Sequence, residues 1–238
     1  MYKQRLRMAC VAVGLGMVAS GSALAEGEGF YFGLSGGVTS IDLPKAEFDA
    51  EFRAFYDPQF PAPTFNGSLT SKLDDSDNGW GVQIGYRWNS YIAAEVGYVD
   101  LGKAVYKGGL AYTNVSTNPV VVTELIATDL RFESSGPTLS LVGMFPIGER
   151  FDIHARAGVY FGDTRERVRT IAASDPDSFE SSERKGGSSD LLFGIGATWN
   201  INDSYSVRLE WQRFDKVGDS DKTAEVDIDL ISLGFLFR

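Results

Sequence analysis

The chain has 238 residues, a formal net charge of -10, 27 glycines, 13% aromatic residues and one cysteine. This negative charge argues against a nucleic-acid partner, and a single cysteine excludes an intrachain disulfide. Abundant glycine and aromatic residues with little helical periodicity favour a domain of many short strands.

The first residues have the pattern of an export signal. Basic residues within the first seven positions precede the apolar run 8–18 and an A-x-A motif at 23–25. The run is shorter than the roughly 20 residues that a membrane-spanning helix needs. We therefore predict a cleaved signal peptide over 1–25 and one exported mature domain over 26–238.

Alternation of apolar and polar residues predicts strands along the mature chain. In 151–161, every second residue from Phe151 to Phe161 is apolar, whereas the intervening positions include Asp152, His154 and Arg156. Side chains of a strand point alternately to opposite faces, so such a segment has one apolar face. The least regular segment contains Gly136-Pro137. We predict eight strands, near 29–40, 78–88, 91–103, 131–146, 151–165, 189–200, 204–215 and 224–237.

The connections alternate in length along the chain. Short turns flanked by aromatic residues alternate with long connections at 41–77, 104–130 and 166–188, and with a shorter one at 216–223. Short turns at one rim, long loops at the other and aromatic girdles are typical of membrane barrels. The pattern predicts an all-β fold, an eight-stranded antiparallel up-and-down transmembrane β-barrel with short periplasmic turns and long external loops. Together with the export signal, it predicts a protein integral to the bacterial outer membrane. The alternative is a soluble periplasmic barrel or sandwich whose apolar parity faces inward.

Three segments carry a resemblance to a known family. Residues 79–102, 205–214 and the terminal SLGFLFR resemble the barrel of the outer membrane protein A family. The resemblance implies an eight-stranded barrel with an interior ionic network, in which Glu95, Arg208 and Glu210 match inward-facing charges. It also implies the barrel-assembly machinery as a partner during biogenesis.

The chain departs from that family in two respects. It ends with the last predicted strand, so no peptidoglycan-binding domain is expected, and it closes on Phe237-Arg238 rather than on an aromatic residue. A barrel without a second domain also looks like the small adhesin and opacity-type surface proteins.

Six charged or titratable residues fall on the parity that would face the barrel lumen. An eight-stranded barrel is only wide enough to be filled by side chains, so these groups must pair with one another. We expect a salt-bridged plug; the alternative is a narrow gated path for small ions, which the glycine-rich lumen faces favour. The six residues are Arg87, Glu95, His154, Arg156, Arg208 and Glu210.

Two further features of the sequence could form chemical sites. His154 is the only histidine, and Asp152 shares its face, but Arg156 stands where outer-membrane lipid A deacylases carry serine in a His-x-Ser pair. The acidic stretches 74–77 and 215–221 lack the spacing of a calcium-binding loop. We expect no catalytic residue, no metal site and no cofactor.

The first long connection contains a predicted amphipathic helix between Pro44 and Tyr56. Phe48, Phe52 and Phe55 recur at i, i+4 and i+7 among charged residues. The helix either packs on the barrel rim or presents an exposed aromatic surface to a host or neighbouring molecule.

These observations leave three functional hypotheses from different classes. The first is a non-enzymatic structural and surface-interaction protein that acts through its external loops, in adhesion or envelope integrity. The second is a narrow, low-conductance pore for small ions, and the third is a lipid-modifying enzyme, for which the sequence offers no set of catalytic residues. Expected partners are outer-membrane lipid and lipopolysaccharide and, through the loops, host or neighbouring surface molecules.

Overall fold

The computed structural model describes residues 28–116, 121–172, 175–219 and 221–238. The predicted signal peptide and its cleavage site lie outside the described residues. The elements in chain order are β1 (Gly29–Ile41), α1 (Lys45–Tyr56), the 3-10 turn η1 (Asp57–Gln59), β2 (Phe65–Asp74), β3 (Ser76–Arg87), β4 (Ile92–Asn114), β5 (Val121–Ile147), β6 (Phe151–Ala172), β7 (Asp175–Asn200), β8 (Tyr205–Val217) and β9 (Val226–Phe237).

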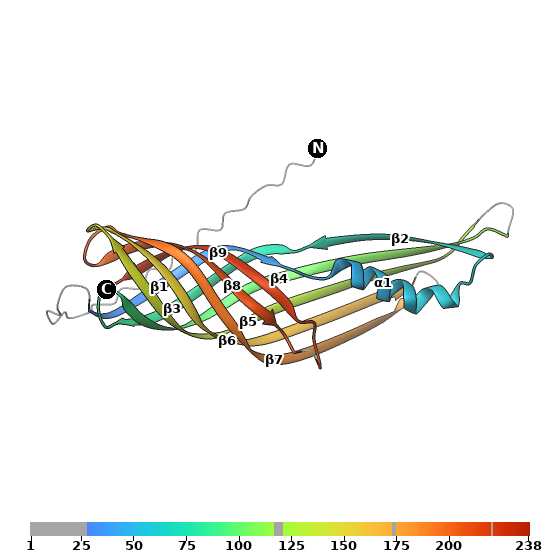
Figure 1. Ribbon diagram of the computed structural model, residues 1–238. Helices are drawn as coiled ribbons and strands as arrows, with labels where there is room; N and C mark the ends of the chain where they lie inside the picture. The colour runs from blue at the N-terminus through green and yellow to red at the C-terminus, as the bar shows by residue number, and fades with distance from the viewer. Residues whose placement is uncertain (1–27, 117–120, 173–174, 220) are drawn as a thin grey trace.

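The described strands form a closed antiparallel barrel (Figure 1). The sheet runs β2-β4-β3-β1-β9-β8-β7-β6-β5, and pairing between β4 and β5 closes the ring. Of these nine strands, β2 and β3 follow one another along β4, separated only at Asp75, and so fill one position. Eight positions therefore surround the lumen, and the predicted fold class is confirmed.

The outer surface of the ring is apolar and bounded by aromatic residues. Along β6, Phe151, Ile153 and Phe161 are exposed, whereas Asp152 and Arg156 are buried in the lumen. This orientation disagrees with the soluble alternative, which would place the apolar parity inside. Residues of the aromatic rim at the short-turn end are Trp88, Tyr91, Phe151, Trp199 and Tyr205, and those of the opposite, upper aromatic rim are Trp80, Tyr98 and Phe161.

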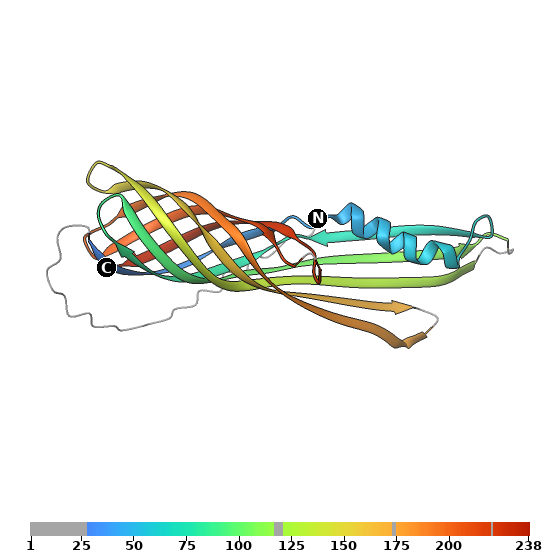
Figure 2. The ribbon, with the colours of Figure 1, turned by 60° about the horizontal axis from the view of Figure 1, so that its bottom comes forward.

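Several strands continue well beyond the closed ring (Figure 2). The connections that we predicted at 104–130 and 166–188 are mostly strand, because β4 pairs with β5, and β6 with β7, far outside the ring. With β2, these four strands form an open five-stranded sheet outside the ring. We call this sheet the extension; it consists of the parts of β2 and β4–β7 that lie beyond the upper aromatic rim. The predicted long external loops are therefore largely ordered β-structure.

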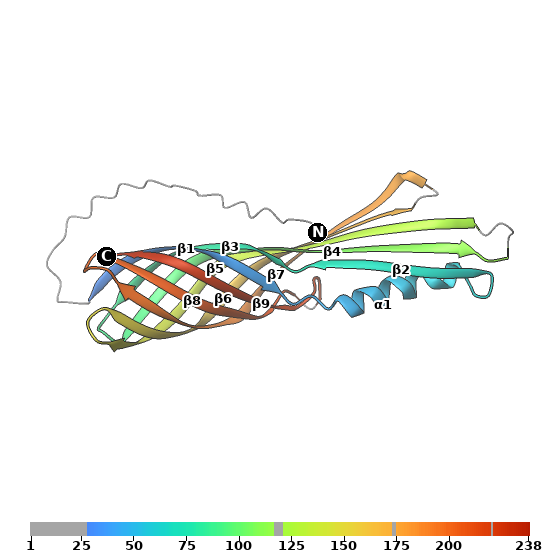
Figure 3. The ribbon, with the colours of Figure 1, turned by 90° about the horizontal axis from the view of Figure 1, so that it is seen from above.

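Helix α1 follows the bounds that the sequence predicted and packs on the inner face of the extension (Figure 3). The Phe48 ring lies 5.5 Å from the Tyr106 ring, and Phe60 stacks on Tyr112 at 4.2 Å between ring centroids. Phe52 packs against a buried cluster that contains Leu110 and Tyr112. Nowhere in the described residues is a helix both long and apolar enough to cross a membrane.

Candidate functional site

Four charged side chains meet in the half of the lumen near the short turns. Arg156 of β6 lies between Glu95 of β4 and Glu210 of β8, at 2.5 Å and 2.6 Å. Arg208 of β8 contacts Glu95 at 2.7 Å. Each of these residues belongs to the inward parity of its strand, so the barrel itself brings together positions far apart in sequence.

The geometry of this network is that of strong, oriented ion pairs. Arg156 donates from Nε and Nη2 to the two oxygens of Glu210, at 2.6 Å and 3.1 Å, and from Nη1 to Ser140 Oγ at 3.0 Å. This fork places both carboxylate oxygens opposite a planar guanidinium. The two acids balance the two arginines, so the buried charges of the network cancel.

The other two predicted lumen residues lie at the border of this network. His154 is 2% exposed, and its Nε2 lies 3.6 Å from Glu210 Oε1. Arg87 lies nearer the short-turn mouth, where it contacts Asp152 at 3.9 Å and donates to the backbone carbonyls of Asn89 and Ser90. Arg87 thus fastens a turn rather than joining the central network.

From their clustering in the sequence, Phe30, Tyr31 and Phe32 are all expected at the aromatic rim of the short-turn end. That expectation is wrong for Tyr31, which points inward and donates a hydrogen bond from its hydroxyl to Glu95. Strict alternation along β1 contains the signal, because Tyr31 has the parity opposite to its two neighbours.

The half of the lumen nearer the extension is filled by apolar side chains. Phe132, Tyr160 and Phe214 are completely buried there, and the rings of Tyr160 and Phe214 meet edge to face at 5.1 Å. The remaining members of this apolar layer are Ile41, Leu43, Val99, Leu101, Ala104, Leu192, Val217, Val226, Ile228 and Leu230. The lumen therefore has two consecutive layers, one ionic and one apolar.

Polar contacts fix α1 to the extension beside its aromatic contacts. Tyr106 donates to Asp49 at 2.6 Å, Tyr112 donates to Asp57 at 2.7 Å, and Lys45 pairs with Asp49 at 2.7 Å. Burial and the hydrogen bond to Asp49 raise the pKa of Tyr106. Burial opposes ionisation of Asp49, but the hydrogen bonds from Lys45 and Tyr106 outweigh it and lower the pKa of this carboxyl. Both shifts favour the docked helix with Asp49 ionised and Tyr106 neutral.

The three phenylalanines proposed as a surface have different environments. Phe48 and Phe52 pack against the extension, whereas Phe55 is 67% exposed. The expected exposed aromatic surface is thus reduced to Phe55, because the spacing i, i+4, i+7 puts a helix face, rather than three free rings, against the sheet.

The acidic stretches act as local partners. Asp219 pairs with Lys222 at 2.8 Å, and Asp77 accepts a hydrogen bond from the Lys103 backbone amide at 3.1 Å. Across the residues that the structure describes, no group of three or more histidine, cysteine or acidic side chains is suited to holding a metal ion.

Curated relatives of the chain share one name. The chain is 25% identical to outer membrane protein A of Serratia marcescens over 183 residues, covering 73% of this chain and 42% of the relative. It is 28% identical to outer membrane protein A of Escherichia fergusonii over 163 residues, covering 67% of this chain and 40% of the relative. The chain thus matches about two-fifths of the length of each.

Solved structures that resemble the fold are small outer-membrane barrels. Neisserial surface protein A matches with a TM-score of 0.45 and 13% identity, covering 87% of this chain and 96% of that one. The attachment invasion locus protein of Yersinia pestis, in complex with the heparin analogue sucrose octasulfate, matches with a TM-score of 0.40 and 15% identity, covering 88% and 98%. These similarities are too low to transfer a ligand or an activity.

The family comparison covers nearly the whole chain. The family described as the OmpA-like transmembrane domain matches residues 26–238, which include every strand of the barrel. Together with the closed ring, the apolar outer surface and the relatives' shared name, this places the protein in the outer membrane. The chain belongs to the OmpA-like transmembrane domain family.

Proposed function

We propose that this protein is a non-conducting, non-enzymatic outer-membrane barrel that acts through its external surface, as a structural and surface-interaction protein. The observation that carries this proposal is the double layer in the lumen. An ionic layer centred on Arg156 is followed along the barrel axis by an apolar layer that includes Phe132 and Phe214.

The two layers would block ions by independent means. If Glu95 exchanged Arg208 for another partner, an ion entering the network would still meet a region filled by Tyr160, Phe214 and Leu192. The hydroxyls of Ser134 and Tyr160 in this region already hydrogen-bond to each other, so they are poorly placed to replace the lost hydration of an ion. A simple exchange of salt-bridge partners is therefore insufficient to open a path. This argument favours the plugged lumen over the low-conductance pore.

A catalytic role has little support from the geometry. His154 is enclosed in the lumen beside Glu210, and the two closed layers leave no route for a lipid or peptide to reach it. We assign His154 a packing role within the ionic layer.

The external surface is the remaining region that could perform a function. The extension is a continuous sheet whose helix is fixed by the Tyr106–Asp49 and Tyr112–Asp57 hydrogen bonds. An ordered surface loses less conformational entropy on binding than a flexible loop would. We propose that the extension, including the exposed ring of Phe55, contacts host or neighbouring surface molecules in adhesion or envelope integrity.

The experiment is single-channel recording from the refolded mature chain in planar bilayers. We expect silence from the unaltered chain and from Glu95→Gln and Phe214→Ala separately, because each single variant keeps one closed layer. The double variant should pass salt-dependent current. Altered gel mobility of unboiled samples establishes that each variant is folded before recording.

A second arm tests the surface role. Replacing residues 107–129 by an Asn-Gly turn joins β4 to β5 across the Tyr106–Leu130 pair and shortens the extension. We expect cells that display this variant to lose attachment to host-cell layers while the barrel stays silent. A steady current from the unaltered chain that changes in Glu95→Gln would replace the proposal with the pore hypothesis.

A further inference from the structure

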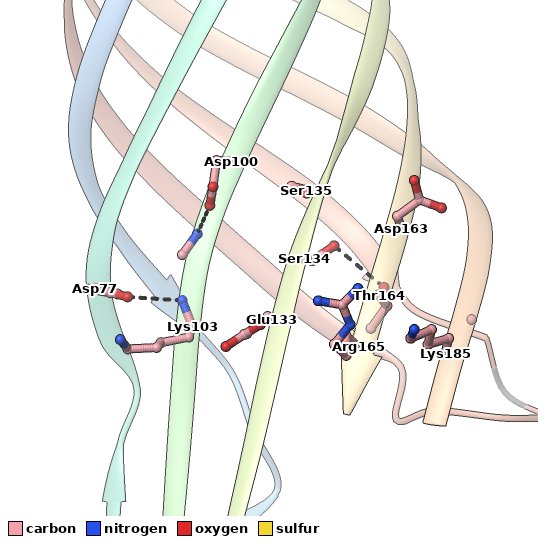
Figure 4. A pocket seen from close by; sticks show the side chains of 12 residues that line it. Asp77, Asp100, Lys103, Glu133, Ser134, Ser135, Asp163, Thr164, Arg165 and Lys185 are labelled. Carbon is pink, nitrogen blue, oxygen red and sulfur yellow. Dashed lines mark hydrogen bonds between the residues drawn. The ribbon is translucent and has the colours of Figure 1, made fainter. Parts of the chain in front are cut away.

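The outward face of the extension is rich in cations, although the whole chain has a net charge of -10. Lys103 of β4, Glu133 of β5, Arg165 of β6 and Lys185 of β7 lie opposite one another on successive strands and form one row across the sheet (Figure 4). We call these four residues the cationic row. The row contains three positive charges and one negative charge.

The next row outward adds one further positive charge, because it contains Arg131 and Arg167 but a single acid, Glu183. The Glu183 carboxylate contacts Arg165 at 3.4 Å, Arg167 at 2.9 Å and Lys185 at 3.1 Å. The hydrogen bonds from Arg167 and Lys185 hold the pKa of Glu183 at about 2, so this acid stays ionised yet faces three cations. The side chains of Arg165, Arg167 and Lys185 are 44%, 44% and 65% exposed, which leaves them accessible to a further anion.

A groove of about 530 Å³ runs beside the cationic row (Figure 4). One wall is the cationic row, and the other is the neighbouring row nearer the membrane, formed by Asp100, Ser135 and Asp163. Asp77 also lines the groove, so the lining carries four carboxylates and three cations, and a phosphate would be held at the cationic row rather than across the whole groove. The Ser134 and Thr164 side chains point inward and are 2% exposed, so the strand backbone forms the floor. The volume lies within the range of small-molecule sites, and hydroxyl and carboxylate groups on this wall suit a polyhydroxylated ligand.

The position of the groove indicates which molecule could reach it. Phe161 belongs to the upper aromatic rim, and Arg165 follows four residues later on the same strand, about 13 Å further along β6 at about 3.3 Å per residue. Side chains of this parity face the surroundings of the barrel, as Phe161 does, so the groove opens sideways at the level of the lipid headgroups.

We propose that this groove and the cationic row bind the phosphorylated saccharide headgroup of the outer-leaflet glycolipid, lipopolysaccharide. Arg165 and Lys185 contact phosphate, for which a guanidinium supplies a planar fork and an ammonium a compact charge. Asp100 and Asp163 accept hydrogen bonds from sugar hydroxyls. The site lies outside the lumen, so it is independent of whether the barrel conducts.

The experiment titrates fluorescent rough-type lipopolysaccharide into detergent micelles that hold the refolded chain. The test variant is Arg165→Gln with Lys185→Gln. The matched control, Arg53→Gln with Lys222→Gln, removes the same charges from side chains that are 40% and 61% exposed on α1 and on the β8–β9 connection. Gel mobility of unboiled samples verifies folding of both.

We expect the test variant to bind about thirtyfold more weakly, the order of effect for two cations at a membrane surface. The control should bind as the unaltered chain does, and dephosphorylated lipopolysaccharide should bind the unaltered chain as weakly as the test variant binds the intact lipid. Equal losses in both variants, no loss in either, or equal binding of the dephosphorylated lipid would each overturn the proposal. So would a variant that loses affinity for soluble inositol hexakisphosphate but keeps its affinity for the lipid, since that result would assign the site to soluble polyanions.

Discussion

Strands β4–β7 run through both the membrane segment and the extension, and the alternation of polar and apolar residues along them reverses between the two regions. In β6 the outward positions up to Phe161 are apolar, whereas those that follow are Asp163, Arg165 and Arg167. On β5 the inward positions Ser140 and Phe132 change from polar to apolar in the same direction along the barrel axis. Each face therefore matches its surroundings: lipid tails outside the ring, lipid headgroups and water outside the extension, and packed side chains on the inward face of both.

A charged side chain contributes differently to stability in these two regions, and the variant with the largest predicted loss of unfolding free energy tests this difference. Glu95→Gln leaves Arg156 and Arg208 short of a countercharge inside the lumen, which should cost about 3–5 kcal/mol of unfolding free energy. Glu183→Gln removes a carboxylate that also contacts arginines, but in water, and should change stability little. Urea unfolding in lipid vesicles, followed by tryptophan fluorescence, measures both. Equal effects of the two variants would contradict the distinction between a buried and a screened ionic cluster.

Docking of helix α1 on the extension can be tested with a variant whose predicted loss of stability is smaller. Phe52→Ala removes a ring packed beside Leu110 and Tyr112, and should weaken docking of α1 by about 2 kcal/mol, roughly half the loss typical of a fully buried phenylalanine. Phe55→Ala is the matched control, since this ring is exposed. Limited proteolysis within residues 45–60 reports helix release, and cleavage in the barrel reports global unfolding. If Phe55→Ala accelerates proteolysis as much as Phe52→Ala does, the assigned helix face is wrong.

The sequence predicted the barrel well because lipid imposes a simple rule on it. Strands with an apolar outward face and aromatic ends were recognisable, and so was α1, since both patterns depend on a single period. The sequence indicated that the charged lumen residues pair with one another, but not that Glu95 pairs with Arg208, because the choice among acids and bases depends on strand register, which sequence alone does not determine.

The extension was missed for a definable reason. Beyond the upper aromatic rim the polar and apolar faces exchange places, and in β4 this change coincides with a bulge between Asp100 and Lys103, where Gly102 has a φ of 72°. A search for strands with constant alternation therefore ends at residue 103. The cationic row was missed with it, because four residues from four strands become neighbours only through the ladder.

The smallest expected effect concerns pH and applies only to the extension. Because docking lowers the pKa of Asp49, free α1 binds protons more readily, so docking is complete above the ordinary carboxyl pKa near 3.8 and weakens as pH falls below it. Because docking raises the pKa of Tyr106, docking is complete below the ordinary phenol pKa of 10.0 and weakens as pH rises beyond it. We expect the docking free energy of α1 to be constant between these two pH limits. At the acid end it should fall by about a few tenths of a kcal/mol, because solvent screens Asp49.

A fluorophore at Ala50→Cys, in a chain expressed from residue 26, follows docking as pH changes, because Ala50 is exposed on α1 and that chain has no other cysteine. Asp49→Asn should remove the weakening of α1 docking at low pH and should lower the docking free energy between the two pH limits. Tyr106→Phe with Tyr112→Phe should remove the alkaline change, since the Tyr112 hydroxyl also donates to an acid of this segment, Asp57. If docking still weakens at both low and high pH in these variants, other groups control helix docking. The hydrogen bonds to Asp49 and Asp57 would then contribute little beside the aromatic packing.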